Sequence, residues 1–320
     1  MRRTCSLVLL AVCLAAQASA EVVLLDGKLA TDITAWANCR WSNYTQAGFS
    51  ASRFEFYRFG GFVGLTARVS PVASARVSFD AGWANSALDI YVDLAWPSVL
   101  AVRAGQFVVP TGFEALTKPE ETKLIDNSMV KRLWKPWDPR DVGIMLSYDA
   151  RPISGALAVI NGNGRQDPLH DDNDAKDIAA RVVLRILEHS GLLFAVRGYH
   201  GKYGAEKVNF DNVAVEASFR DWGLDVTAEG QRAVFGTALR NSFYVQAAYR
   251  LTGLLEPAGR YTMEFAEDRF DFGVTGGMNF RVKGDRLKLM LDYDHWERRA
   301  PGVWDDIVEN RFLVQLQAGI

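Results

Sequence analysis

The chain lacks the long apolar run that a membrane-spanning helix requires. After residue 20, no segment approaches the roughly 18 uninterrupted apolar residues of such a helix, which excludes a helical membrane protein. Cysteine is scarce, and only Cys39 remains beyond residue 20, so a disulfide framework within the chain is excluded. Basic residues are not in excess, with 36 against 38 acidic residues. Because nucleic acid is bound through a basic excess, we expect no nucleic-acid partner.

The first 20 residues have the pattern of a secretory signal peptide. A basic start at residues 1–3 is followed by an apolar stretch at 7–16 and by small residues at 18–20. We therefore expect removal of residues 1–20 and one mature domain, residues 21–320, with 34 basic and 38 acidic residues. The alternative is a lipoprotein signal that uses Cys13.

Apolar and polar residues alternate through most of the remaining chain. Between residues 270 and 281, phenylalanine, valine and methionine alternate with aspartate, threonine, asparagine and arginine, and residues 76–83 and 242–250 repeat the pattern. A period of two is typical of a β-strand with two different faces. One face of such a strand suits lipid and the other suits water, so the pattern predicts an all-β transmembrane antiparallel barrel.

We count sixteen predicted strands, and fourteen to eighteen are compatible with the uncertainty of their ends. Short connections alternate with longer ones near 40–51, 109–140, 162–175 and 299–304, which is the layout of short periplasmic turns and long external loops. A barrel of this size encloses a water-filled lumen. The predicted strands are 26–39, 52–70, 75–84, 86–95, 99–108, 141–149, 153–161, 176–187, 191–201, 206–219, 222–234, 240–251, 258–266, 269–282, 285–298 and 305–320.

The longest connection, residues 109–140, carries many charges of both signs. A loop of this length in a compact domain is either functional or disordered. We expect it to fold into the lumen and to narrow the channel, whereas a solvated external loop is the alternative. Its basic candidates for contact with anions are Lys118, Lys123, Lys131 and Arg132.

Basic residues also lie on the polar face of many predicted strands, where they would line the lumen. Guanidinium groups suit phosphate and carboxylate, so a row of them would favour anions. Acidic residues such as Asp89 and Glu216 share these faces, and mutual neutralisation is the alternative. The lumen candidates are Arg58, Arg68, Arg76, Arg103, Arg181, Arg185, Arg197, Arg250, Arg281 and Lys288.

Five segments in order resemble the phosphate-selective porin O and P family. They are residues 89–93 (Asp-Ile-Tyr-Val-Asp), 102–114 with its Gly-Gln-Phe and Pro-Thr-Gly elements, 138–144, 159–164 and 177–181. The resemblance implies a sixteen-stranded outer-membrane porin, often trimeric, with its third loop folded into the lumen and with phosphate among its anions. It implies neither a cofactor nor a bound metal.

Other functions remain open beside an anion channel. They are a non-selective diffusion porin, an outer-membrane enzyme and a structural barrel with a plugged lumen. An enzyme would need a nucleophile and a base on neighbouring strands, and the four histidines are not placed for this in the predicted topology. Gly60 and Gly64 on inward faces indicate space inside the barrel, and the acidic run 167–174 offers oxygen ligands for calcium but lacks the spacing of a calcium loop.

Overall fold

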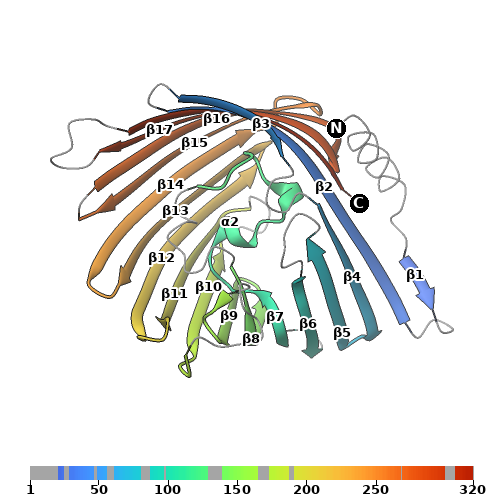
Figure 1. The fold of residues 1–320 in the computed structure, drawn as a ribbon. Coiled ribbons are helices and arrows are strands. Elements are labelled where there is room, and N and C mark those ends of the chain that lie inside the picture. Colours follow the sequence, from blue (N-terminus) through green and yellow to red (C-terminus); the bar gives the residue numbers. More distant parts are fainter. Residues whose placement is uncertain are drawn as a thin grey trace.

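The computed structural model describes residues 21–24, 29–46, 49–55, 61–80, 87–96, 99–128, 139–164, 173–186, 191–267, 269–299 and 307–319. The predicted signal peptide lies outside these residues, so its assignment stays a prediction. Long strands curve around a common interior, and a segment with two short helices lies inside the ring (Figure 1).

The strands of the described chain are β1 (Glu21–Leu24), β2 (Leu29–Gln46), β3 (Phe49–Glu55), β4 (Gly61–Ser70), β5 (Ala73–Asp80), β6 (Ala87–Trp96), β7 (Leu100–Val108), β8 (Arg140–Ala150), β9 (Ile153–Ile160), β10 (Asp177–Arg185), β11 (Leu193–Tyr203), β12 (Val208–Asp221), β13 (Leu224–Phe235), β14 (Ala238–Tyr249), β15 (Leu255–Ala266), β16 (Arg269–Asp285), β17 (Leu287–Arg299) and β18 (Ile307–Gly319).

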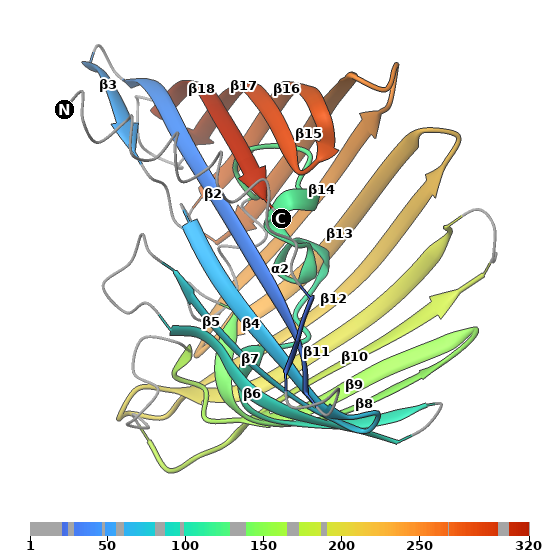
Figure 2. The same ribbon diagram turned by 90° about the vertical axis from the view of Figure 1, so that its right-hand side faces the viewer.

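The barrel closes where the last strand meets the second. β18 pairs antiparallel with β2, from Gly319 opposite Trp36 to Glu309 opposite Gln46. β3 and β4 pair with successive parts of the other edge of β2, so together they fill one position in the wall. β1 is a short addition to the start of β2. The wall therefore has sixteen positions, which confirms the predicted strand number, and Figure 2 shows the steep tilt of the strands.

The two faces of each strand differ as the alternation predicts, and β12 shows this clearly. Asn212 and Glu216 point inward and are buried, whereas Val213 and Val215 point outward and are 58% and 60% exposed. Exposed large apolar side chains recur on most strands. Contact of so many apolar side chains with water is unfavourable, so this outer surface indicates contact with lipid. No helix in the described part of the chain is long and apolar enough to cross a bilayer.

One expectation about the wall needs correction. The first long strand was expected to end at residue 39 and to be followed by a loop over 40–51, but β2 continues to Gln46. Residues 40–46 stay in the sheet because they pair with β3 on one edge and with β18 on the other. The inward-facing Arg40 and Ser42 are buried there.

The interior is not hydrophilic throughout, contrary to expectation. An apolar cluster lies inside the barrel at one end of β7 to β13, where Phe107, Ile160, Tyr199 and Phe210 pack together. These side chains extend from the inward faces of their strands, next to the start of the long loop. They close part of the cross-section of the barrel by packing.

Constriction loop and lumen cavity

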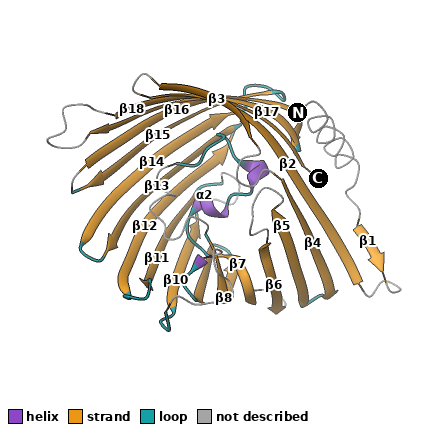
Figure 3. Ribbon diagram, viewed as in Figure 1, coloured by secondary structure: helices purple, strands orange, loops and turns teal. Residues whose placement is uncertain are grey.

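The described part of the long loop, residues 109–128, folds into the lumen. It contains α2 (Phe113–Leu116) and the 3-10 helix η1 (Pro119–Glu121), which lie within the ring of strands in Figure 3. Val109 and Leu124 are each only 2% exposed. The prediction of an inserted loop is therefore confirmed, and the solvated external loop is excluded for these residues.

Asp126 fixes the loop to the barrel wall. Its Oδ1 accepts a hydrogen bond from Arg40 on β2 at 2.6 Å, and Arg311 on β18 lies 3.0 Å from its Oδ2. Arg260 on β15 donates to the backbone oxygen of Asp126 at 2.7 Å. Burial opposes the charge of the carboxylate, but the arginines outweigh it and hold the pKa of Asp126 below its usual value. The loop is thus fixed by charge as well as by shape.

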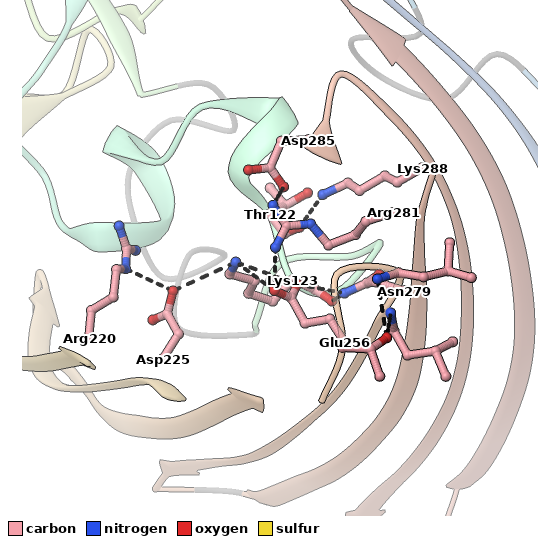
Figure 4. A network of polar contacts seen from close by, with 12 residues as sticks. Thr122, Lys123, Arg220, Asp225, Glu256, Asn279, Arg281, Asp285 and Lys288 are labelled. Carbon is pink, nitrogen blue, oxygen red and sulfur yellow. Dashed lines mark hydrogen bonds and ion pairs between the residues drawn. The ribbon is translucent and has the colours of Figure 1, made fainter. Parts of the chain in front are cut away.

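Backbone groups of the loop are bound by side chains of β16 and β17. Lys288 donates to the carbonyl oxygens of Glu120 and Thr122 at 2.9 and 2.5 Å. Asn279 donates to the carbonyl oxygen of Lys123 at 2.9 Å, and the Ile125 amide donates to the Asp292 carboxylate at 2.6 Å. Figure 4 shows Lys288 and Asn279 reaching the loop from neighbouring strands. These contacts satisfy an irregular backbone inside the barrel.

Lys123 lies between two parts of the wall. Its Nζ is 3.4 Å from Glu256 on β15 and 3.8 Å from Asp225 on β13. Arg220 also binds Asp225 at 2.9 Å, and Arg281 binds Glu256 at 3.1 Å (Figure 4). Arg281 also lies 3.1 Å from Asp285, so three basic groups share three acids and the charges of this network balance.

Two more predicted arginines form a paired cluster on the wall of β10 to β13. Arg181 binds Glu216 at 2.6 Å, and Arg197 binds Glu229 at 2.6 Å. Arg197 is only 3% exposed, and it also donates a hydrogen bond to the Gln231 side-chain oxygen. Arg181 lies over the Phe113 ring, 5.1 Å from its centre, and thereby connects this wall to the loop.

The remaining predicted basic residues occupy several environments. Most are on inward faces. Arg68, Arg76, Arg103 and Arg185 are each paired with an acid, so the alternative of mutual neutralisation describes these four well. Arg58, Lys131 and Arg132 lie outside the described residues. Arg76 lies 3.6 Å from Asp89, and Arg103 lies 2.7 Å from Asp93. Near strand ends, Arg185 lies 3.0 Å from Asp149, and Arg68 forms an ion pair with Asp32. Lys118 and Arg250 are exposed.

Gly64 does not leave empty space as expected. A Cβ at this position would lie 2.8 Å from Thr34 Oγ1 and 2.9 Å from Arg76 Nη2. The glycine instead leaves room for the Arg76 guanidinium, which donates a hydrogen bond to Thr66 at 2.9 Å. Gly60 lies outside the described residues.

A cavity of about 540 Å³ lies between the loop and the wall of β10 to β15. The turn residues Arg151 and Pro152 and the end of β10 belong to its lining, so it is on the side of the short turns. Its walls combine apolar side chains with five basic and four acidic residues. The lining includes Phe113, Leu124, Leu193, Tyr244, Lys123, Arg151, Arg185, Arg220, Arg260, Glu114, Glu121, Asp126 and Asp225.

The three arginines that bind Asp126 were not among the predicted site residues. Arg40 was placed in a loop, whereas Arg260 and Arg311 occupy polar positions next to the outward Tyr261 and Phe312. The alternation alone could have identified Arg260 and Arg311 as inward-facing. What it could not show is that they converge on one carboxylate.

No group of potential metal ligands occurs in the described part of the chain. Most of the acidic run 167–174 lies outside the described residues. Asp174 forms an ion pair with Lys207 on the neighbouring turn, and this contact with the ammonium lowers the pKa of the carboxyl.

Comparison with known proteins identifies the fold. No protein-family model matches the chain, and no curated protein is similar in sequence. Solved structures are similar in fold. One is the anion-selective porin from Comamonas acidovorans, with a TM-score of 0.70 and 16% identity over 91% of this chain and 100% of that one. Two others are the outer-membrane channel DcaP of Acinetobacter baumannii (TM-score 0.68, 11% identity, 92% of this chain and 99% of that one) and Salmonella typhi OmpF in complex with daunomycin (TM-score 0.66, 12% identity, 93% of this chain and 99% of that one).

These similarities extend over the whole barrel. The chain therefore has the fold of bacterial outer-membrane porins, which confirms the predicted location in the outer membrane. They are too distant in sequence to distinguish the phosphate-selective O and P type from other porins.

Proposed function

We propose that the chain is an outer-membrane porin through which small hydrophilic solutes, preferentially anions such as phosphate, diffuse passively. The observation that carries this proposal is the charged loop fixed across the lumen of a sixteen-position barrel. A narrow, charge-lined passage is what selective diffusion requires, because charges facing water set the potential that a solute meets. No covalent chemistry is needed.

Support for anions comes from the uneven exposure of the lumen charges. Arg220 is 65% exposed, whereas its partner Asp225 is 13% exposed, and Lys123 shares its acids with other cations. The porin of Comamonas acidovorans, which has a similar fold, is anion-selective. The competing proposal is a non-selective diffusion porin, and the many closed ion pairs of the wall favour it.

An outer-membrane enzyme has less support. His200 on β11 and His295 on β17 are the two histidines in the described residues, and they bind Asp211 and Asn310 respectively. They lie on distant strands, so they do not combine into one acid–base site. A homotrimer, which the resemblance implies, stays part of the proposal and is tested by chemical cross-linking.

Reversal potentials across a planar bilayer under a salt gradient test the anion preference. We expect potentials of the anion-selective sign in chloride and in phosphate. Neutralising Lys123, Lys131 and Arg132 to glutamine should shift them toward cation selectivity. Lys207→Gln, which removes one positive charge from an external turn, is the control and should leave them unchanged. Cation selectivity of the unmodified protein would refute the anion preference but not the channel.

A further inference from the structure

Three short turns on one side of the barrel each present an exposed basic residue. Arg151 lies between β8 and β9, Arg250 between β14 and β15, and Arg286 between β16 and β17. None of the three side chains has an ion-pair partner within the described part of the chain. Their positive charge is therefore available to an anionic partner from outside the chain.

The acidic residues near these turns are already bound by other arginines. Their ion pairs are Asp149 with Arg185 at 3.0 Å, Asp225 with Arg220 at 2.9 Å and Asp285 with Arg281 at 3.1 Å. By contrast, basic residues near the longer connections pair with acids of their own. Examples are Lys207 with Asp174, Arg298 with Asp271 at 3.1 Å and Arg299 with Glu297 at 2.8 Å.

Lipid-facing side chains flank the same turns. Tyr148 and Ile153 lie on either side of Arg151 in the sequence and are 44% and 48% exposed. Tyr249 directly precedes Arg250 and is 47% exposed. Aromatic side chains gather at membrane surfaces, and a long basic side chain beside them can reach the lipid headgroups. The turns therefore lie at the level where the bilayer begins.

The turn between β12 and β13 adjoins Arg250, whose amide donates to the Gly223 carbonyl oxygen at 2.7 Å. Trp222 is 82% exposed and has a φ of 53°, a left-handed conformation that is costly for so large a residue. Its ring contacts Phe219 on the outer face, 5.9 Å between ring centres, and its amide donates to Asp221 at 2.8 Å. An exposed indole held beside a guanidinium suits a membrane surface.

From these observations we propose that the three turns form a binding surface for anionic phospholipids. Arg151, Arg250 and Arg286 bind the phosphate groups, and the neighbouring outward side chains contact the acyl chains. A guanidinium suits phosphate because its donors form a planar fork that matches two phosphate oxygens. This inference goes beyond the proposed function, because it rests on the location of the barrel in the outer membrane and not on conduction.

Native mass spectrometry of the protein released from detergent micelles tests the preference for anionic lipid. The probes are phosphatidylglycerol and phosphatidylcholine with the same acyl chains, of which only the first has a net negative charge. One basic residue near an anionic lipid surface strengthens association about fivefold. We therefore expect phosphatidylglycerol to bind at least about tenfold more tightly than phosphatidylcholine. Equal dissociation constants would overturn the proposal.

A triple variant tests the assignment to these turns. Arg151→Gln, Arg250→Gln and Arg286→Gln together should reduce the preference to less than about twofold. Lys207→Gln, Arg298→Gln and Arg299→Gln together remove the same charge near the longer connections, and this control should keep the preference. Resistance of the barrel to heat in detergent shows that both variants are folded. An unchanged preference in the first variant, or an equal loss in both, would place the lipid elsewhere and overturn the proposal.

Reversal potentials distinguish lipid from a permeating anion, since Arg151 also borders the lumen cavity. If the first triple variant shifts the reversal potential but keeps the lipid preference, the arginines act on solutes and the lipid surface is wrong. A protein that prefers phosphatidylglycerol but forms no channels would instead refute the proposed function and leave this surface intact.

Discussion

Asp126→Asn should release the loop of residues 109–128 from the wall. The substitution keeps the size of the side chain and removes the charge that binds Arg40 and Arg311. Arg40 is 2% exposed, so it would be left as a buried charge without its main counterion. Breaking a buried ion pair on one side costs about 3–5 kcal/mol. The equilibrium for docking of the loop would then fall by about 10²-fold or more.

Single-channel recording measures the consequence. We expect Asp126→Asn channels to have a larger mean conductance and more current noise than the unmodified protein, because the loop no longer occupies one position. Glu121→Gln is the matched control, since it removes the same charge from an exposed site on the same loop. Resistance of the barrel to heat in detergent shows that both variants are folded. If Asp126→Asn and Glu121→Gln give the same conductance and noise as the unmodified protein, the anchoring role of Asp126 is wrong.

Three further predictions concern the wall and the chain end. Arg197→Gln should lower the free energy of unfolding by about 3–5 kcal/mol because it leaves the buried Glu229 unpaired. Arg185→Gln, at a solvent-exposed pair, should lower it by less than about 1 kcal/mol. Denaturant titration compares the two variants, and equal effects would contradict this reasoning. Gly201→Ala should destabilise the end of β11, because its Cβ would lie 2.1 Å from the Asp177 carboxyl carbon. Gly276→Ala is the control, since its Cβ would meet nothing within 4 Å. Similar thermal midpoints of the two variants would contradict the packing described. Amino-terminal sequencing of protein from the outer membrane should begin at Glu21, and a start at Met1 or at Cys13 would contradict the predicted cleavage.

The wall of the barrel was largely predictable because each strand carries its own evidence. Side chains alternate between lipid and lumen, so residues 208–221 show both faces without reference to any other part of the chain. The one large error in the wall, the early end of the first strand, occurred because residues 40–46 are kept in the sheet by their neighbours β3 and β18. Pairing of that kind is not visible in a single segment.

The contacts inside the barrel were less predictable for the same reason. Arg103 was expected to face the lumen, but only the register that places it opposite Asp93 shows that the two form a pair. The anchor of the loop joins residues 40, 126, 260 and 311, and no local pattern connects them. The alternation predicts which side chains are inside, whereas the register determines which charges are available to a solute.

Passive diffusion through the barrel requires that water fills a continuous path through the lumen. Adding the purified, folded protein to one side of a planar bilayer tests this directly. We predict discrete, stable steps of current, each from one inserted channel, with an ohmic dependence on voltage. A folded barrel that inserts into the bilayer and leaves the current at its baseline would contradict the claim.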